Sequence, residues 1–259
     1  MWLPLFDECA WPAAIRHDQF LPGQLRAFRA ALTPPVGAVL FDFDDTLLDR
    51  RGTVERYLHR FVDRIGFSTD VAHAYRERFH SLEGAGYTPR ATVFEQLASE
   101  FPAAGSHEQL VADWHARAFD ECVYIDGATD VLAWCRRVGL KTAIVTNGRS
   151  AFQRPKLERV GVIPLVDAVL VSGEEGIAKP DPELPRRAAE RLGVAPDACA
   201  FVGDNPHTDV AGAVAAGMHA IWLERHVPWP DDAPRPAHSI TDIVALPKVI
   251  SPRAWPRSP

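Results

Sequence analysis

Hydrophobic positions along this chain fall into two patterns, and each pattern predicts a different kind of element. Short apolar runs rich in β-branched residues predict buried strands, at 36–41, 140–146, 166–171, 198–202 and 218–223. Helical spacing of apolar residues predicts helices that end at glycine, at 128–138, 150–160, 181–192 and 208–216. Because these strands and helices alternate with short loops, we predict an α/β fold with a doubly wound parallel sheet.

Residues 53–122 interrupt this alternation, because they show helical periodicity and no convincing strand. The apolar positions predict a bundle of four helices, at 54–65, 71–82, 90–101 and 107–122. We therefore expect an α-helical domain inserted after the first strand. The expected organisation is an N-terminal extension, a core in two pieces, the inserted domain and a tail, at 1–35, 36–52 with 123–250, 53–122 and 251–259.

The two ends of the chain are rich in proline and carry weaker patterns. A short helix is predicted at 23–32, an edge strand at 237–240 and a last short helix at 241–249. Trp2 and Trp11 in the extension are expected to pack on the main body, with a dimer contact as the alternative. The sequence leaves open whether the protein is a monomer or a homodimer.

Composition excludes several classes of function. Hydrophobic residues make up 47% of the chain and charged residues 24%, as in ordinary soluble domains. A net charge of −6 argues against a nucleic-acid partner, which calls for a basic surface. There is no signal-peptide pattern and no apolar run of membrane length, so no membrane partner is expected. Four cysteines without a CxxC spacing argue against structural zinc and favour a cytoplasmic protein with free thiols.

The first predicted strand ends in a run of acids, Asp42-Phe-Asp-Asp-Thr46. Asp42 and Asp44 are two residues apart, so near the end of a strand their side chains project to the same side. Two carboxylates held together repel each other unless a cation or a shared proton relieves them. The stretch therefore predicts a divalent metal site. An ordinary polar turn, with Asp45 and Thr46 capping the next turn, is the alternative that this stretch alone leaves open.

Three later segments also place polar residues at or near predicted strand ends. They are Thr146-Asn-Gly148, Lys179-Pro-Asp-Pro182 and Gly203-Asp-Asn-Pro-His-Thr-Asp209. Because the carboxyl ends of parallel strands lie at one edge of a sheet, all of these segments are expected to converge there with the acids of the first strand. Carboxylates suit Mg²⁺, while lysine and backbone N–H groups suit phosphate oxygens. The sequence thus predicts a site for a phosphate group and a hard cation.

In this order the four segments resemble the motifs of the haloacid dehalogenase superfamily of hydrolases, over about residues 36–250. The matching residues are Asp42, Asp44 and Thr46, then Thr146, then Lys179, then Asp204 and Asp209. The segment from Thr146 to Arg159 is also similar to the branch that contains nucleotide and phosphoglycolate phosphatases. The resemblance implies a Rossmann-like core with a small helical cap that closes over the site and reads the leaving group of a small phosphorylated metabolite.

The resemblance also implies roles for the matching residues. Asp42 would be the nucleophile that forms an aspartyl-phosphate, and Asp44 the general acid and base. Thr146 and the amide of Asn147 would bind the phosphoryl oxygens, and Lys179 would balance the negative charge there.

Magnesium is the cofactor that the resemblance implies. Asp42 and Asp204 would ligate Mg²⁺ through their carboxylates. Asp209 would either ligate it as well or hold the groups that do. Asp44 is included among the expected metal residues through its backbone carbonyl.

Alternatives within the same superfamily stay open at this point. A 2-haloacid dehalogenase attacks carbon and lacks an acid at the position of Asp44, and a phosphomutase usually carries glycine where this chain has Thr46. A catalytically idle member that only binds a phosphorylated ligand is a third possibility. In the inserted domain, Gly84, Gly86, Tyr87 and Arg90 lie in a loop between helices that either faces the substrate or is an ordinary connection.

Overall fold

The computed structural model describes residues 36–86, 88–231 and 236–250. The expected extension with its helix at 23–32 and the tail at 251–259 lie outside these residues. The described chain divides into two compact units. The first, here called the sheet unit, contains the described residues up to Leu48 and those from Tyr124 onward, and the second, the helical unit, is Asp49–Val123.

A six-stranded sheet forms the centre of the sheet unit, with the strand order β3-β2-β1-β4-β5-β6. The strands are β1 Ala38–Phe41, β2 Lys141–Thr146, β3 Ala168–Val171, β4 Cys199–Gly203, β5 His219–Leu223 and β6 His238–Ile240. Every pairing is parallel, so all carboxyl ends lie at one edge. The α/β fold with a doubly wound parallel sheet is therefore confirmed, and β1 lies at its centre between β2 and β4.

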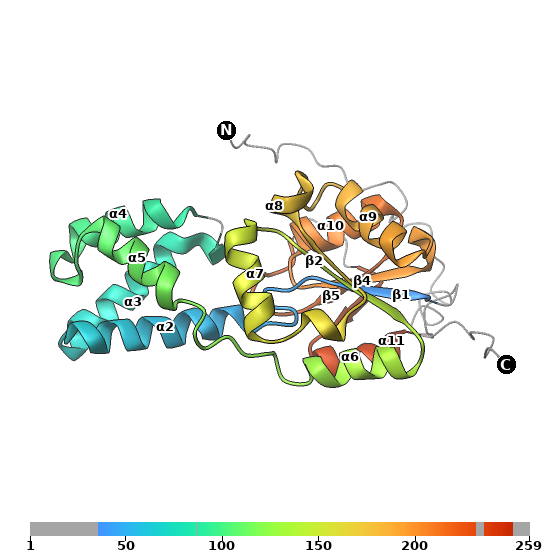
Figure 1. Ribbon diagram of the computed structural model, residues 1–259, viewed down its shortest axis with the longest axis horizontal. Coiled ribbons are helices and arrows are strands. Elements are labelled where there is room, and N and C mark those ends of the chain that lie inside the picture. The colour runs from blue at the N-terminus through green and yellow to red at the C-terminus, as the bar shows by residue number, and fades with distance from the viewer. Residues whose placement is uncertain (1–35, 87, 232–235, 251–259) are drawn as a thin grey trace. The chain divides into compact units, whose positions relative to one another are not determined.

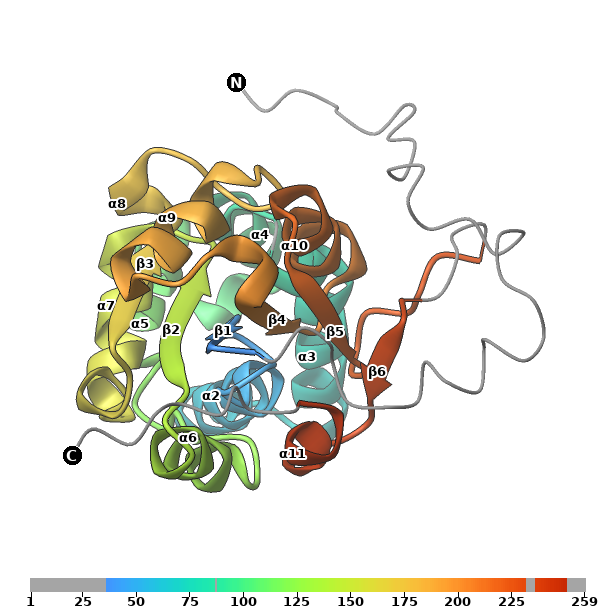
Figure 2. The same ribbon diagram turned by 90° about the vertical axis from the view of Figure 1, so that its right-hand side faces the viewer.

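Helices cover both faces of this sheet. Figure 2 shows α9 (Glu183–Leu192) and α10 (Ala211–Ala216) on one face, and α6 (Ala128–Arg137) and α11 (Leu246–Val249) on the other. Since neither face meets solvent, all four residues of β1 are buried and apolar. This double burial explains why the strands stand out in the sequence as continuous apolar runs.

Two further helices and a π-helical turn belong to the sheet unit. They are α7 Ser150–Arg159, α8 Ser172–Glu175 and the π-helical turn Pro206–Val210. Short 3₁₀ turns lie at Ile163–Leu165, Pro196–Ala198 and Ile243–Ala245. The single helix predicted at 208–216 is wrong in its first turn, because Asn205 accepts the N–H groups of His207 and Thr208 and winds the chain into the π-helical turn before α10 begins.

The helical unit contains four α-helices (Figure 1), and aromatic side chains form the core between them. The helices are α2 Arg50–Ile65, α3 Thr69–Glu83, α4 Arg90–Glu100 and α5 His107–Arg117. Trp114 lies at the centre of this core, with its ring 4.9 Å from that of Tyr57 and 5.7 Å from that of Phe79. Helix α2 begins earlier than predicted because Asp49 accepts the N–H of Gly52 and caps it. Within the described ranges, no helix has both the length and the apolar character of a membrane span.

Candidate active site

The loops that follow the strands bring four charged residues together at the carboxyl edge of the sheet. Lys179 Nζ donates to Asp42 Oδ1 at 2.7 Å and lies 2.7 Å from Asp209 Oδ1. Asp42, Asp204 and Asp209 each offer a carboxylate oxygen, and these oxygens lie within 4.8 Å of one another. All four side chains are buried. The predicted convergence of the strand ends therefore places these residues in one cluster, here called the three-acid group with its lysine.

Charge is unbalanced in this cluster, because one lysine faces three carboxylates. Burial raises the pKa of Asp42, and the negative charge of Asp209 adds to that effect, while Lys179 only partly offsets both. The pKa of Asp204 is raised by burial and by the charges of Asp42 and Asp209. Burial opposes the charged form of Lys179, but Asp209 and Asp42 outweigh it and raise its pKa.

A hard divalent cation fits this arrangement. The donors are three buried carboxylates with converging oxygens, which is the ligand type that Mg²⁺ prefers. Burial and the neighbouring negative charges raise the pKa values of Asp42 and Asp204, and a metal ion would supply the positive charge that favours their ionised forms. The residues present therefore match the expected cofactor.

Local backbone features hold the acids after β4. Asp209 accepts the backbone N–H of Asn205 at 3.0 Å, and the indole N–H of Trp222 donates to the carbonyl of Asp204 at 3.0 Å. Gly203 is required by close approach, because a Cβ there would lie 2.4 Å from Asp209. Glycine precedes Asp204 at the end of this strand because any larger residue would clash with the side chain of Asp209 in the following π-helical turn.

Asn147 has a structural contact that the sequence did not predict. Its side-chain amide donates to the carbonyl of Lys179 and accepts the N–H of Lys179, both at 2.8 Å. This pair of bonds ties the loop that carries Lys179 to the end of β2. The expected contact of the Asn147 backbone amide with phosphoryl oxygens stays a prediction, as does that of Thr146, which is buried and accepts a hydrogen bond from Gln153 at 2.8 Å.

Asp44 is not one of the three grouped acids, although its negative charge also raises the pKa of Asp42. Its carboxylate contacts Lys156 Nζ at 2.6 Å and 2.5 Å, and Gln153 Nε2 donates to it at 2.9 Å. A metal contact through the Asp44 side chain therefore has no support from the geometry, and a contact through its carbonyl stays a prediction. Sequence reasoning missed Lys156 and Gln153, although a lysine and a glutamine three apart on one helix after Thr146 were a usable signal.

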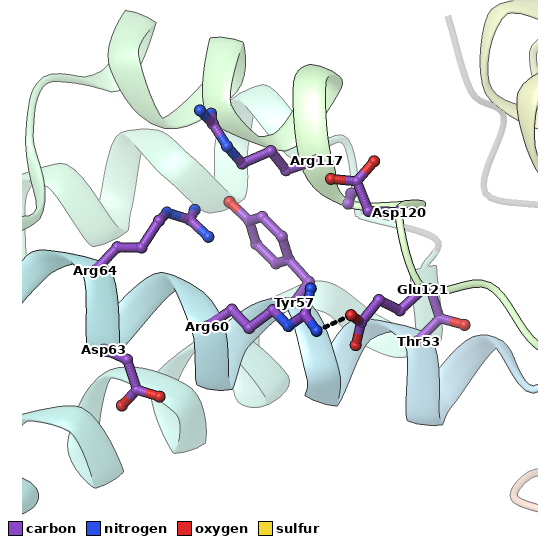
Figure 3. A pocket seen from close by; sticks show the side chains of 9 residues that line it. Thr53, Tyr57, Arg60, Asp63, Arg64, Arg117, Asp120 and Glu121 are labelled. Atoms are coloured by element: carbon purple, nitrogen blue, oxygen red, sulfur yellow. Dashed lines mark ion pairs between the residues drawn. The ribbon is translucent and has the colours of Figure 1, made fainter.

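The helical unit contains a cavity of about 390 Å³ on the side of α2 and α5 (Figure 3). Its lining residues are Thr53, Tyr57, Arg60, Asp63, Arg64, Arg117, Ala118, Asp120 and Glu121. Arg60 pairs with Glu121, and Arg64 and Arg117 both pair with Asp113. The lining contains three arginines and three acids, Asp63, Asp120 and Glu121, so its formal charges balance and favour neither a phosphate nor a metal.

Arg90, which the sequence placed in a loop between helices, is the first residue of α4 and has a packing role within the helical unit. Its guanidinium donates to the buried Glu83 at 2.8 Å and lies 4.7 Å from the ring centroid of Trp114. Arg50 donates to the same glutamate at 2.7 Å and covers Gly86 closely. These contacts hold the loop to the aromatic core, which favours the interpretation of an ordinary connection.

Comparison with known proteins agrees with this geometry. The family model of the haloacid dehalogenase-like hydrolases matches residues 36–217. A phosphoserine phosphatase of Thermus thermophilus is 41% identical over 136 residues, which cover 52% of this chain and 55% of that protein. A glyceraldehyde 3-phosphate phosphatase of Methanopyrus kandleri is 33% identical over 73% of this chain and 84% of its own length.

Solved structures show the same fold. The magnesium-bound structure of YfnB from Bacillus subtilis, itself described as a putative hydrolase of the same superfamily, superimposes with a TM-score of 0.65. The two chains are 25% identical, and the match covers 82% of this chain and 97% of that one. The matched segment of the family model runs from the first strand to α10 and includes every residue of the three-acid group. This chain belongs to the haloacid dehalogenase-like hydrolase family, in its phosphatase branch.

Proposed function

We propose that this protein hydrolyses small-molecule phosphate monoesters with Mg²⁺, through an aspartyl-phosphate formed on Asp42. The observation that carries the proposal is the three-acid group with its lysine, in which the buried Asp42 contacts Lys179 and lies beside carboxylate oxygens that can ligate a cation. The names of the relatives support phosphate ester chemistry but differ in substrate, so the proposal extends to the substrate class only.

The chain's own residues can carry both halves of the reaction. An oxygen of Asp42 forms a bond to phosphorus while the bond from phosphorus to the leaving oxygen breaks, and Asp44, which enters this step protonated, gives its proton to that oxygen. A water molecule then attacks the phosphorus while the bond from phosphorus to Asp42 breaks. Asp44 takes the proton of that water and is protonated again, and inorganic phosphate leaves.

Charge stabilisation comes from the groups around Asp42. Lys179 is held against the nucleophile by its contacts with Asp42 and Asp209, so its charge is in place before phosphate binds. Asp42, Asp204 and Asp209 would hold Mg²⁺, which when bound supplies positive charge to the phosphoryl oxygens. The helical unit is proposed to select the substrate as a cap.

Asp44 separates this proposal from dehalogenation. Attack on carbon with halide as the leaving group needs no proton donor, whereas an alkoxide leaving group does. The carboxylate of Asp44 is fixed by Lys156 and Gln153, and such a supported acid favours the phosphatase. The phosphomutase alternative predicts transfer of phosphate between two positions of a sugar without net release of phosphate.

The deciding experiment is a panel of phosphorylated metabolites assayed for phosphate release with Mg²⁺ and with a chelator. We expect turnover of at least one ester with Mg²⁺, loss of turnover with the chelator, and loss in Asp42→Asn. Asp197→Asn, a change at an exposed acid, serves as the control and should retain activity. Halide release from 2-haloacids, or thermal stabilisation by a phosphate ester without turnover, would overturn the proposal in favour of the dehalogenase or the idle member.

A cytoplasmic location is proposed on the state of the cysteines. Cys122, Cys135 and Cys199 are free thiols in the described part of the chain. Burial raises the pKa of Cys135 and of Cys199 to about 12, so both stay protonated and unreactive. Free, inert thiols fit a reducing compartment.

A further inference from the structure

Helix α7 carries a buried lysine that belongs to none of the four motifs. Lys156 is 6% exposed, and its ammonium contacts both carboxylate oxygens of Asp44, at 2.6 Å and 2.5 Å. Burying an ammonium group is costly unless it is paired, so a lysine in this position needs a fixed anionic partner. The contact joins residues 112 positions apart in the chain, which means that the docking of α7 on the sheet specifies it.

Lys156 gives Asp44 a cation of its own. Lys179 is already committed to Asp42 and Asp209, and these acids with Asp204 form the group that lacks positive charge. Asp44 follows Asp42 by two residues, and its negative charge is one of the causes that raise the pKa of Asp42, so a second cation beside Asp44 offsets part of that charge. The ammonium also lies 5.9 Å from the ring centroid of Phe43, the residue between the two acids.

Gln153 supports the same carboxylate from the same helix. It lies three residues before Lys156, which places both side chains on one face of α7. Its Nε2 donates to Asp44 at 2.9 Å, to Thr146 Oγ1 at 2.8 Å and to the carbonyl of Asn147 at 2.7 Å. Helix α7 therefore links Asp44 to the end of β2, where phosphoryl oxygens are expected to bind.

We propose that Lys156 is a positioning residue for Asp44, assisted by Gln153. It holds the carboxylate in one orientation, outside the three-acid group, so that Asp44 meets the leaving oxygen of the substrate rather than the metal ligands. The inference rests on the proposed phosphatase function, because it assigns Asp44 the proton transfer to that oxygen. It adds to the four motifs a lysine that acts on the substrate only through Asp44.

Leaving-group dependence tests this role directly. Lys156→Met keeps the length and apolar stem of the side chain and removes its charge. An alkyl phosphate from the panel needs a proton on its leaving oxygen, whereas 2,4-dinitrophenyl phosphate releases a stable anion. Both esters form the same aspartyl-phosphate, and its hydrolysis also uses Asp44, so the comparison uses kcat/KM, which reports the steps up to release of the leaving group. We expect kcat/KM for the alkyl ester to fall by about 10²-fold, and kcat/KM for the dinitrophenyl ester to change by less than about threefold.

Two controls separate positioning from a general structural effect. The ratio of the two kcat/KM values is measured on one preparation, so it does not depend on the fraction of the variant that folds. Lys141→Met, at an exposed lysine paired with Asp167, should leave the ratio unchanged. In the background of Asp44→Asn, Lys156→Met should cause almost no further loss on the alkyl ester, because a residue that acts through Asp44 has nothing left to position.

Contrary outcomes are equally definite. Equal loss on both esters in Lys156→Met, or losses that multiply in the Asp44→Asn background, would overturn the positioning role while leaving the phosphatase function intact. An unchanged ratio in an active Lys156→Met protein would do the same. Absence of turnover in the parent protein on both esters would overturn the proposed function, and the role of Lys156 with it.

Discussion

Each of the two units buries a cluster of charged side chains. Negative charge is in excess in one cluster and is neutralised by positive charge in the other. In the sheet unit, Asp42, Asp204 and Asp209 share Lys179, and the pKa values of Asp42 and Asp204 are raised. In the helical unit, a single buried acid, Glu83, receives hydrogen bonds from two arginines and contacts a histidine.

The pKa of Glu83 shows how complete its neutralisation is. Burial alone would raise this pKa, but the hydrogen bond with His80 and the charges of Arg50 and Arg90 outweigh burial and lower it to about 2. A buried acid is therefore not in itself a sign of an active site. The three-acid group carries more negative than positive charge and can therefore bind a metal ion. In the Glu83 cluster the charges are neutralised by protein side chains, so it stabilises the packing of helices.

The largest effect is expected when the single lysine is removed from the unbalanced cluster. Lys179→Met leaves Asp42 and Asp209 without their paired cation, so phosphate release should fall by about 10²- to 10³-fold. The melting temperature of the metal-free protein should also fall, and Mg²⁺ should restore part of it. Lys141→Met is the matched control and should change neither quantity. Retained activity in Lys179→Met would refute the contrast drawn between the two clusters.

The balanced cluster should respond in stability. Glu83→Gln removes the carboxylate that Arg50 and Arg90 share, at side-chain exposures of 14% and 16%, so we expect a loss of about 2 kcal/mol in the free energy of unfolding. Urea denaturation measures this loss. Glu100→Gln breaks an exposed pair with Arg78 in the same unit and should leave stability unchanged. Equal effects of the two changes would show that burial adds nothing to the Glu83 contacts.

Much of the fold could be predicted from the sequence because the sheet is covered on both faces. Continuous apolar runs located the central strands, and the predicted strand at 36–41 became β1 at Ala38–Phe41. Helix α8 was missed because a single turn, Ser172–Glu175, is too short to show periodicity. The π-helical turn was missed because it depends on hydrogen bonds to Asn205 that no apolar pattern records.

The candidate site was predictable to the extent that strand topology decides it. Parallel strands bring their carboxyl ends to one edge, so the meeting of Asp42 with Lys179 followed from their positions after strands. The partner of Asp44 did not follow, because the contact with Lys156 depends on how α7 is rotated against the sheet. Side-chain pairing across a helix and a loop is set by packing, which the sequence encodes only indirectly.

A smaller effect, which also distinguishes the two charged clusters, is expected in the pH dependence of stability. The raised pKa values of Asp42 and Asp204 mean that the folded metal-free protein keeps protons that the unfolded chain loses above its ordinary carboxyl pKa of 3.8. The metal-free protein should therefore lose stability as pH rises above that value, by on the order of 1 kcal/mol per pH unit for one group. Because Mg²⁺ replaces those protons, the stabilisation by Mg²⁺ should grow with pH.

Thermal melts with and without Mg²⁺, from about pH 5 to about pH 9, measure this difference. The lowered pKa of Glu83 affects stability in a different pH range. Its contribution to the free energy of unfolding is complete above pH 4.5 and is lost as pH falls toward 2. His80, whose pKa is raised by Glu83 and Glu55, contributes stability that is lost as pH rises above 6.5. Its effect is the same with and without Mg²⁺, so the difference isolates the sheet unit. A pH-independent difference would contradict the charge deficit.

The smallest effect is expected at the cavity of the helical unit, where charge is balanced and hydrogen bonds are shared. Tyr57 donates to Asp113 at 3.0 Å, and the same carboxylate also pairs with Arg64 and Arg117. Tyr57→Phe should cost only about 1 kcal/mol in unfolding free energy, because Asp113 keeps two cationic partners. Urea denaturation gives the value, and kcat should not change. A loss as large as that of Glu83→Gln would mean that this network, and not the Glu83 cluster, dominates the stability of the helical unit.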